Sequence, residues 1–454
     1  MADHIAVSFD GVGSGIGELT WGQVGIWQSI QRSGASSTIG GVSTVPPGTT
    51  VDDVAAILRF IMSRHQSLRT RLRFDADDGR PRQVVSASGE AALEVVDVPA
   101  AADGAAAAAE VGDRYLNTAF DYEHEWPVRM AAIRCGGVVT HSVAVYLHLS
   151  IDGAGLDALL ADLATMDPAI GPAAAPVDAV QPLELAERQR GPAARRQSEA
   201  SLRHWERVLR TVAPSRFGEV ADPDLLAPRW HMAGYRSPAA RLAVGTLAAR
   251  HDTDSSPVLL AAFAVALAEV TGINPVVTLL AVSNRFRPGL AASVCQVAQA
   301  SPCVVDVSAA TFGEVIARAR KAALGTYLHA YYDPARRADL IATVNRDRGV
   351  EIDLGCTFND RRRQAPDPVA PEPTADDLRG AMDLGTYRPI ARTDLSRQKL
   401  YLGIDDTPGA IDLTMSADTH HVSPASMEAI ARGMERVLVD AVLDPPESRT
   451  APGS

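Results

Sequence analysis

The 454-residue sequence is poor in cysteine, and its few thiols are scattered. It has 4 cysteines, namely Cys135, Cys295, Cys303 and Cys356, which form no Cys-x-x-Cys pair and have no histidine cluster beside them. This spacing argues against a disulfide framework and against a zinc site, so we expect no bound metal. A reducing, cytoplasmic location fits such cysteine usage best.

Aromatic residues, positive charge and long hydrophobic runs are also scarce. Aromatics make up 5% of the chain and the formal net charge is -12 at pH 7. Without a base-stacking platform or a basic footprint, nucleic acid is an improbable partner, and the acidic balance argues equally against an anionic membrane. The longest apolar run, residues 258–268, is too short to span a bilayer and predicts a buried helix, and residues 1–10 show no secretory signal.

Helical and strand patterns alternate along both halves of the chain, which predicts an α/β protein. We expect helices over residues 50–66, 104–117, 155–165, 193–209, 257–270, 311–324 and 424–440, and strands over 83–86, 93–98, 128–134, 138–149, 276–282, 303–307, 352–358, 399–405 and 411–417. A segment rich in Pro and Ala at 167–181 predicts a linker. It divides the chain into an N-terminal lobe at 1–170 and a C-terminal lobe at 181–454.

Residues 361–381 depart from this alternation. Three arginines, Arg361 to Arg363, are followed by a proline-rich stretch with scattered acids. A connection of this length is usually functional or disordered. Both a crossover loop and a disordered excursion agree with the pattern.

The segment with the most chemical information ends the apolar alternation of residues 138–149. It places His148, Asp152 and Gly153 at fixed spacing, and a helical pattern follows at once. A histidine that a strand delivers to a turn beside a helix N-terminus can do acid–base chemistry next to an anion site. The alternative is a core histidine that is hydrogen-bonded to backbone. The nearby acid and a glycine that admits close approach favour a functional site.

Leu147–Gly153 resembles the His-His-x-x-x-Asp-Gly signature of the nonribosomal-peptide condensation domains and their chloramphenicol-acetyltransferase-like relatives. Further segments resemble other motifs of this family in family order, and together they cover nearly the whole chain: 19–27, 65–72, 202–205 and 282–285. The chain is therefore identified as a suspected member of this family. Because its length matches one such domain, we expect a free-standing member.

The chain departs from the family pattern at three places. Leu147 replaces the first histidine of the pair, and Asn284 replaces the glycine before Arg285. Residues 294–300 match weakly the stretch that normally reads Val-Gly-x-Phe-Val-Asn-Thr. These departures bear on the choice of substrate more than on the fold.

The resemblance implies two chloramphenicol-acetyltransferase-like α/β sandwich lobes in a V-shaped pseudo-dimer, with the motif in a tunnel between them. It implies that His148 is the general base or a hydrogen-bonding positioner, and that Gly153 offers a backbone N–H and room for a thioester. Asp152 would pair with Arg285 and hold the turn. The first amides of the helix at 155–165 would favour an oxyanion. Arg69 would be a structural ion-pair member.

The function that the resemblance implies is acyl transfer in natural-product biosynthesis. An acyl thioester on a carrier protein (acyl or peptidyl) or on coenzyme A would react with an amine or alcohol acceptor to give an amide or an ester. The phosphopantetheine thioester would be a substrate arm, and we expect no permanently bound cofactor. The clusters at 336–337 and 361–363 are either solvated or receive an acidic carrier protein. The alternative, motivated by Leu147 and residues 294–300, is a catalytically degenerate protein that binds or scaffolds an assembly line.

Overall fold

The computed structural model describes residues 2–166, 177–218, 227–308, 310–362, 372–395 and 398–443. The chain forms two compact units. The first contains residues 1–198, 283–299 and 332–334, and the second contains 199–282, 300–331 and 335–454.

This division differs from the one expected from the sequence, which separates the lobes at 170–181. Residues 283–299 follow a strand of the second unit but belong to the first, because their polar contacts lead to Asp152 and its neighbours. The expected linker at 167–181 falls largely outside the described residues.

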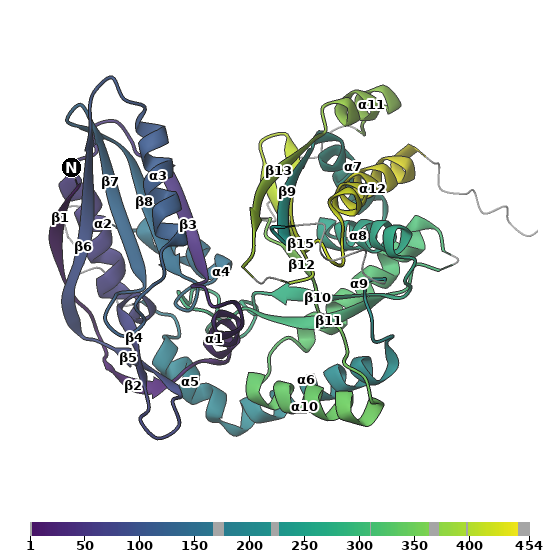
Figure 1. Ribbon diagram of the computed structural model, residues 1–454, viewed down its shortest axis with the longest axis horizontal. Coiled ribbons are helices and arrows are strands. Elements are labelled where there is room, and N and C mark those ends of the chain that lie inside the picture. Colours follow the sequence, from purple (N-terminus) through teal and green to yellow (C-terminus); the bar gives the residue numbers. More distant parts are fainter. Residues whose placement is uncertain are drawn as a thin grey trace, which may run out of the picture. The chain divides into compact units, whose positions relative to one another are not determined.

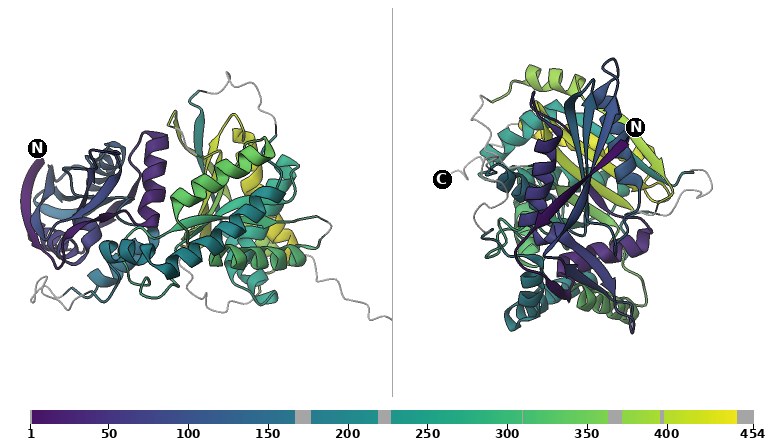
Figure 2. Two further views of the ribbon diagram at one scale, coloured as in Figure 1. Left: turned by 90° about the horizontal axis from the view of Figure 1, so that it is seen from below. Right: turned by 90° about the vertical axis from the view of Figure 1, so that its left-hand side faces the viewer.

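A five-stranded sheet is the middle layer of the first unit (Figure 1). Its strand order is β1 (Ala2–Asp10), β6 (Ser88–Val98), β7 (Val128–Cys135), β8 (Val138–Leu147) and β3 (Thr38–Thr44). Strands β6 and β7 are parallel, and the other neighbours are antiparallel. Figure 2 shows the twist of this sheet in its purple and blue strands.

The two faces of this sheet carry different helices, since successive strand residues point to opposite sides. Met130 and Ala132 of β7 pack with α2 (Val51–Arg64) and α4 (Gly153–Leu163). Ala131 and Ile133 pack with α3 (Gly104–Asn117). The hairpin of β7 and β8 is thereby covered on both faces, which fixes where β8 ends.

A three-stranded sheet and two helices complete the first unit. The strands are β2 (Gly15–Glu18), β5 (Pro81–Val85) and β4 (Thr70–Phe74), and the helices are α1 (Trp21–Ser33) and α5 (Pro182–Arg190). Arg69 precedes β4 and is fully buried. It donates hydrogen bonds to the carbonyl oxygens of Val12, Gly13 and Ser86. Arg69 therefore binds backbone carbonyl oxygens of the segment before β2 and of the residue after β5, in place of the ion pair expected for it.

A seven-stranded sheet forms the second unit. Its order is β11 (Gln299–Val305), β10 (Val276–Val282), β12 (Cys356–Asp360), β14 (Leu400–Thr407), β15 (Ala410–Asp418), β9 (Trp230–Ser237) and β13 (Thr386–Thr393). One continuous apolar core joins it to helices α7 (Pro238–Arg250), α8 (Ser255–Thr271), α9 (Phe312–Leu328) and α12 (Pro424–Leu443). Helix α8, expected as a buried helix, is at the centre of this core.

Three more helices lie outside this core or at its margin. They are α6 (Pro192–Thr211), α10 (Pro334–Arg348) and α11 (Ala375–Asp383). Helix α11 covers residues 375–381 of the segment 361–381 and ends at Asp383, so this part is neither a loop nor disordered; residues 363–371 lie outside the described residues. In the described ranges, no single helix is long and apolar enough to cross a membrane, although α7 and α8 pass by length and composition as a pair bent by 114°.

The two units repeat one arrangement of strands. The order β6-β7-β8-β3 in the first corresponds to β12-β14-β15-β9 in the second, with the same parallel and antiparallel neighbours. Helices α3 and α11 connect the parallel pair in each unit, and α4 and α12 follow each hairpin. This repeat agrees with two lobes of one α/β architecture.

Candidate active site

The candidate site begins where β8 ends. The backbone N–H of His148 donates to the Ser37 carbonyl oxygen at 2.8 Å, which continues the pairing of β3 with β8 by one residue. A tight turn follows, in which the Ser150 N–H and Oγ both donate to the Leu147 carbonyl oxygen at 2.8 and 2.7 Å. This turn brings the half-buried His148 side chain to the start of α4.

The ring of His148 is fixed by its own turn. Its Nδ1 lies 2.7 Å from the Ile151 carbonyl oxygen. A carbonyl oxygen only accepts, so Nδ1 carries the proton and the neutral ring has its lone pair on Nε2. The histidine is thus prepared to take a proton at Nε2, which is the tautomer that a general base of this orientation requires.

Asp152 is a buried carboxylate with four donors. It is the N-cap of α4, and its Oδ1 accepts from the Gly155 N–H and from Arg285 Nη2, both at 2.7 Å. Its Oδ2 accepts from the N–H groups of Val297 and Ala298, both at 2.8 Å. A carboxylate with this many donors is saturated, so the contacts give Asp152 a structural role.

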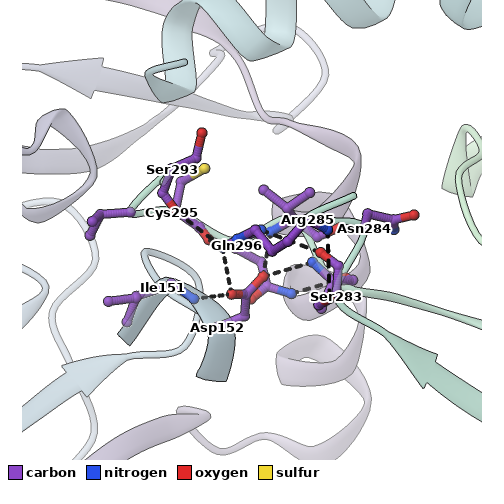
Figure 3. Close-up of polar contacts among 12 residues, drawn as sticks. Ile151, Asp152, Ser283, Asn284, Arg285, Ser293, Cys295 and Gln296 are labelled. Carbon is purple, nitrogen blue, oxygen red and sulfur yellow. Dashed lines mark hydrogen bonds and ion pairs between the residues drawn. The ribbon is translucent and has the colours of Figure 1, made fainter. Parts of the chain in front are cut away.

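Arg285 enters the site from the segment that follows β10. The structure contains the ion pair with Asp152 that the resemblance implied, and Nη2 also donates to the carbonyl oxygens of Ser293 and Cys295 at 3.1 and 3.0 Å. Figure 3 shows the Asp152 carboxylate facing Arg285 and the strip from Ser293 to Gln296. Two parts of the chain 133 residues apart are joined by this one guanidinium group.

The backbone of residues 293–298 makes most of the polar contacts that join this strip to the site, and the side chains of Val294, Cys295 and Val297 are buried in apolar clusters. The Val294 carbonyl oxygen accepts from Ser67 Oγ at 2.6 Å, and the Gln296 carbonyl oxygen accepts from Thr20 Oγ1 at 3.3 Å. Arg285 and Asp152 hold the remaining groups described above. Backbone groups are common to all residue types, so this strip keeps its place although its side chains match the family pattern weakly.

Leu147 and Gly153 flank the histidine turn. The Leu147 side chain is buried in an apolar cluster with Leu19, Leu72 and Phe120. Gly153 is the exposed first residue of α4, and a Cβ built on it meets nothing within 4 Å. There is open space at the helix start, as the resemblance implied for a thioester.

The Cys295 thiol next to the site is buried and protonated. Burial raises the pKa of Cys295, whose carbonyl faces Arg285, to about 12, so its thiol stays protonated. Across the described residues, no group of three or more His, Cys, Asp or Glu side chains could hold a metal ion.

The arginine clusters proposed for carrier docking are largely neutralised by the chain's own acids. Arg361 pairs with Asp405, and Arg362 is almost buried against Asp360 at 2.8 Å. Arg336 lies 3.5 Å from Glu199 on the exposed surface. Arg363 falls outside the described residues.

The sequence did not identify Ser67 as a site residue, and it identified Asn284 only as a departure from the family pattern. Ser67 lies inside the recognised segment 65–72, but its hydroxyl reaches a carbonyl 227 residues away, which no local pattern reveals. Asn284 has a backbone φ of 58°, in the left-handed region. That conformation favours glycine and is tolerated by asparagine. The glycine that the family has at this position was therefore the sequence signal for a left-handed turn.

Comparison with known proteins points to the same family that the sequence motifs resemble. The condensation domain family matches residues 16–451. Nonribosomal peptide synthetase kk1B of Curvularia clavata is 27% identical over 254 residues, which cover 53% of this chain and only 2% of that much longer protein.

Two solved structures share the fold. The condensation domain that mediates chain release from the enacyloxin polyketide synthase matches with a TM-score of 0.69 at 18% identity, covering 98% of this chain and 86% of that one. The epimerization domain from the third module of tyrocidine synthetase B matches with a TM-score of 0.72 at 15% identity, covering 96% and 98%. With the family match over nearly the whole length, these findings establish that the chain belongs to the condensation domain family.

Proposed function

We propose that this chain is an acyltransferase that joins an acyl thioester to an amine or alcohol acceptor. The observation that carries the proposal is the His148 ring, whose Nδ1 bond to the Ile151 carbonyl oxygen leaves Nε2 as the basic atom. Membership of the condensation domain family supports the reaction class.

In the proposed reaction His148 acts on the acceptor. As the acceptor nitrogen or oxygen attacks the thioester carbon, its proton moves to Nε2, and the new amide or ester bond forms. The carbon–sulfur bond then breaks and the proton passes to the leaving thiolate. The ring is neutral at the start and the end, so it acts as a base and then as an acid within one cycle.

The start of α4 would stabilise the charge that develops on the thioester oxygen. The first amides of a helix have no partner within it, and the helix dipole places partial positive charge there. Asp152 already takes the Gly155 N–H, so the amides of Gly153 and Ala154 remain as the donors for an oxyanion.

The donor would be delivered on a phosphopantetheine arm by an acyl or peptidyl carrier protein, or on coenzyme A. The arm is a substrate group rather than a resident cofactor. His148 can take a proton from an amine or from an alcohol, so the proposal includes both an amide and an ester product.

The alternative is a non-catalytic binding or scaffolding partner of an assembly line, which the loss of the first histidine motivates. Leu147 is one member of a buried apolar cluster, while the His148 ring is bonded on the turn. A leucine at 147 is therefore compatible with an intact base at 148.

The test supplies the purified chain with acyl-coenzyme A, acyl-carrier-protein and short acyl thioesters, paired with amine and alcohol acceptors. Products are identified by mass spectrometry. His148→Ala should lower the rate by about 100-fold or more, as loss of a general base does. His421→Ala, at the corresponding turn of the second unit, is the matched control and should keep the wild-type rate.

Undiminished turnover by His148→Ala would remove this residue from the mechanism. If the wild-type chain consumes no thioester but binds a loaded carrier protein, the scaffolding alternative replaces the acyltransferase.

A further inference from the structure

Asn284 combines a left-handed backbone with complete burial. Its φ is 58° and its side chain is fully enclosed. Asparagine tolerates this conformation far better than most residues, although glycine adopts it without cost. A glycine would therefore satisfy the backbone here, and the side chain calls for a separate explanation.

The side-chain amide of Asn284 makes contacts that glycine cannot supply. Nδ2 donates to the Val297 carbonyl oxygen at 3.4 Å, and Oδ1 accepts from Arg287 Nε at 3.1 Å. The N–H of Val297 donates to Asp152 Oδ2. Val297 is thus held at both of its backbone polar groups, its carbonyl oxygen by Asn284 and its N–H by Asp152.

These contacts lead to the His148 ring in two steps. The Asp152 carboxylate accepts hydrogen bonds from Arg285, the residue after Asn284, and from the N–H of Val297. The Asp152 N–H and the Ile151 carbonyl group share one planar peptide unit, so a change in the backbone φ of Asp152 tilts the oxygen that fixes His148 Nδ1.

We propose that Asn284 is a positioning residue for His148, a role that rests on the acyl transfer proposed above. Its backbone turns Arg285 toward Asp152, and its amide holds Val297 so that Asp152 keeps one orientation. The Ile151 carbonyl oxygen then stays in line with Nδ1, and the lone pair stays on Nε2.

The experiment compares Asn284→Gly with Asn284→Asp in the full chain. The glycine variant keeps the left-handed turn and loses both side-chain contacts. The aspartate variant keeps an acceptor for Arg287 and loses the donor to Val297. Glycine is favoured at this φ, which offsets part of the stability lost with the two contacts, and each variant is assayed well below its measured melting temperature, which separates positioning from folding.

Two readouts do not depend on activity. Amide hydrogen exchange at Val297 and Ala298 should become about tenfold faster in both variants, the change expected for loss of one hydrogen bond. The 15N spectrum of His148 should show a smaller share of the Nδ1–H tautomer. Unchanged exchange and an unchanged ring spectrum in Asn284→Gly would overturn the proposal.

The third readout is the pH–rate profile of acyl transfer. Both variants should lower kcat up to about tenfold with little change in the acceptor KM, and should shift the limb of the profile that reports His148. Wild-type kcat and profile in Asn284→Gly would also overturn it. A wild-type chain without acyl transfer would count against the proposed function, while exchange and the ring spectrum would still decide the role of Asn284.

Discussion

The turn after β8 and the turn after β15 occupy the same place in the two units, yet only the first has the features of an active site. Each joins the second strand of a hairpin to a helix, and each contains a buried aspartate that is paired with an arginine far away in sequence. Asp152 pairs with Arg285, and Asp418 pairs with Arg229 at 2.7 and 2.6 Å. The buried ion pair is therefore a shared structural device.

The differences lie in the histidine and in the helix start. His148 precedes its aspartate and bonds to a turn carbonyl, whereas His421 follows Asp418 and lies 4.0 Å from its carboxylate. Helix α4 begins with Gly153, which has an N–H, while α12 begins with Pro424, which has none. The two turns therefore share the buried acid and differ at the histidine and at the first helical amide, the two groups that the proposed reaction uses.

The largest effect should come from removing the two aspartates. Asp152→Ala leaves Arg285 buried without its counter-charge, with a side-chain exposure of 11%, and should cost about 3–5 kcal/mol of unfolding free energy. Asp418→Ala leaves Arg229, whose exposure is 38%, able to reach water, and should cost about 1.5–3 kcal/mol. Urea titration measures both, and equal costs would contradict this reading.

The next largest effect should come from a substitution that gives α4 the first residue of α12, which is a proline. Gly153→Pro removes the N–H, and the fold should accept it, because proline is tolerated at the first helical position and Asp152 already has an extended backbone (φ −104°, ψ 177°). The acyl-transfer rate should fall about 100-fold or more, as for loss of one oxyanion donor.

Gly153→Ala is the control for this substitution. It keeps the N–H and adds a methyl group that meets no protein atom, so the melting temperature should stay near wild type and the rate should fall far less than in Gly153→Pro. A wild-type rate in Gly153→Pro would remove the helix start from the mechanism.

A smaller effect concerns the strip at 293–298. Ser67→Ala leaves the buried Val294 carbonyl oxygen without its hydrogen bond and should cost about 1–3 kcal/mol. Ser426→Ala, at an interaction between two hydroxyls near the start of α12, should cost less, since water can replace the partner. Matched thermal or urea unfolding of the two variants decides this.

The smallest effect is a pH dependence of stability from the buried histidines. Burial lowers the pKa of His421 and of His65 below the ordinary value of 6.5. The unfolded chain therefore binds more protons than the folded one below about pH 6.5, and stability should fall as the pH falls through that range. His421→Gln should make the decline from pH 7 to pH 5 shallower; an unchanged slope would contradict the assignment.

Local patterns predicted the elements that position His148. Helices expected over 50–66 and 257–270 form as α2 and α8; α2 has a capping box of Thr50 and Asp53, and α8 ends at Gly272 with a left-handed φ of 69°. Strand β8, the turn and α4 also follow from short-range alternation. The pairing of Asp152 with Arg285 came from the family resemblance, since periodicity says nothing about contacts across 133 residues.

The elements that the sequence did not predict depend on distant neighbours. Strand β3 contains two glycines and little apolar character, and it forms because β8 offers it a partner. At Gly40 any side chain would collide with the Ala144 carbonyl oxygen, 2.1 Å from a built Cβ. The membership of 283–299 in the first unit likewise follows from backbone hydrogen bonds, which leave no trace in residue type.

The excursion at 283–299 means that the histidine turn is not encoded by a contiguous gene segment. A fragment encoding residues 1–198 alone would contain His148 and Asp152 but would lack the guanidinium group and the two amides that saturate the carboxylate. Recombination or truncation between the halves would thus separate the base from its support. Any swap of lobes between relatives would have to carry this stretch along with the first half.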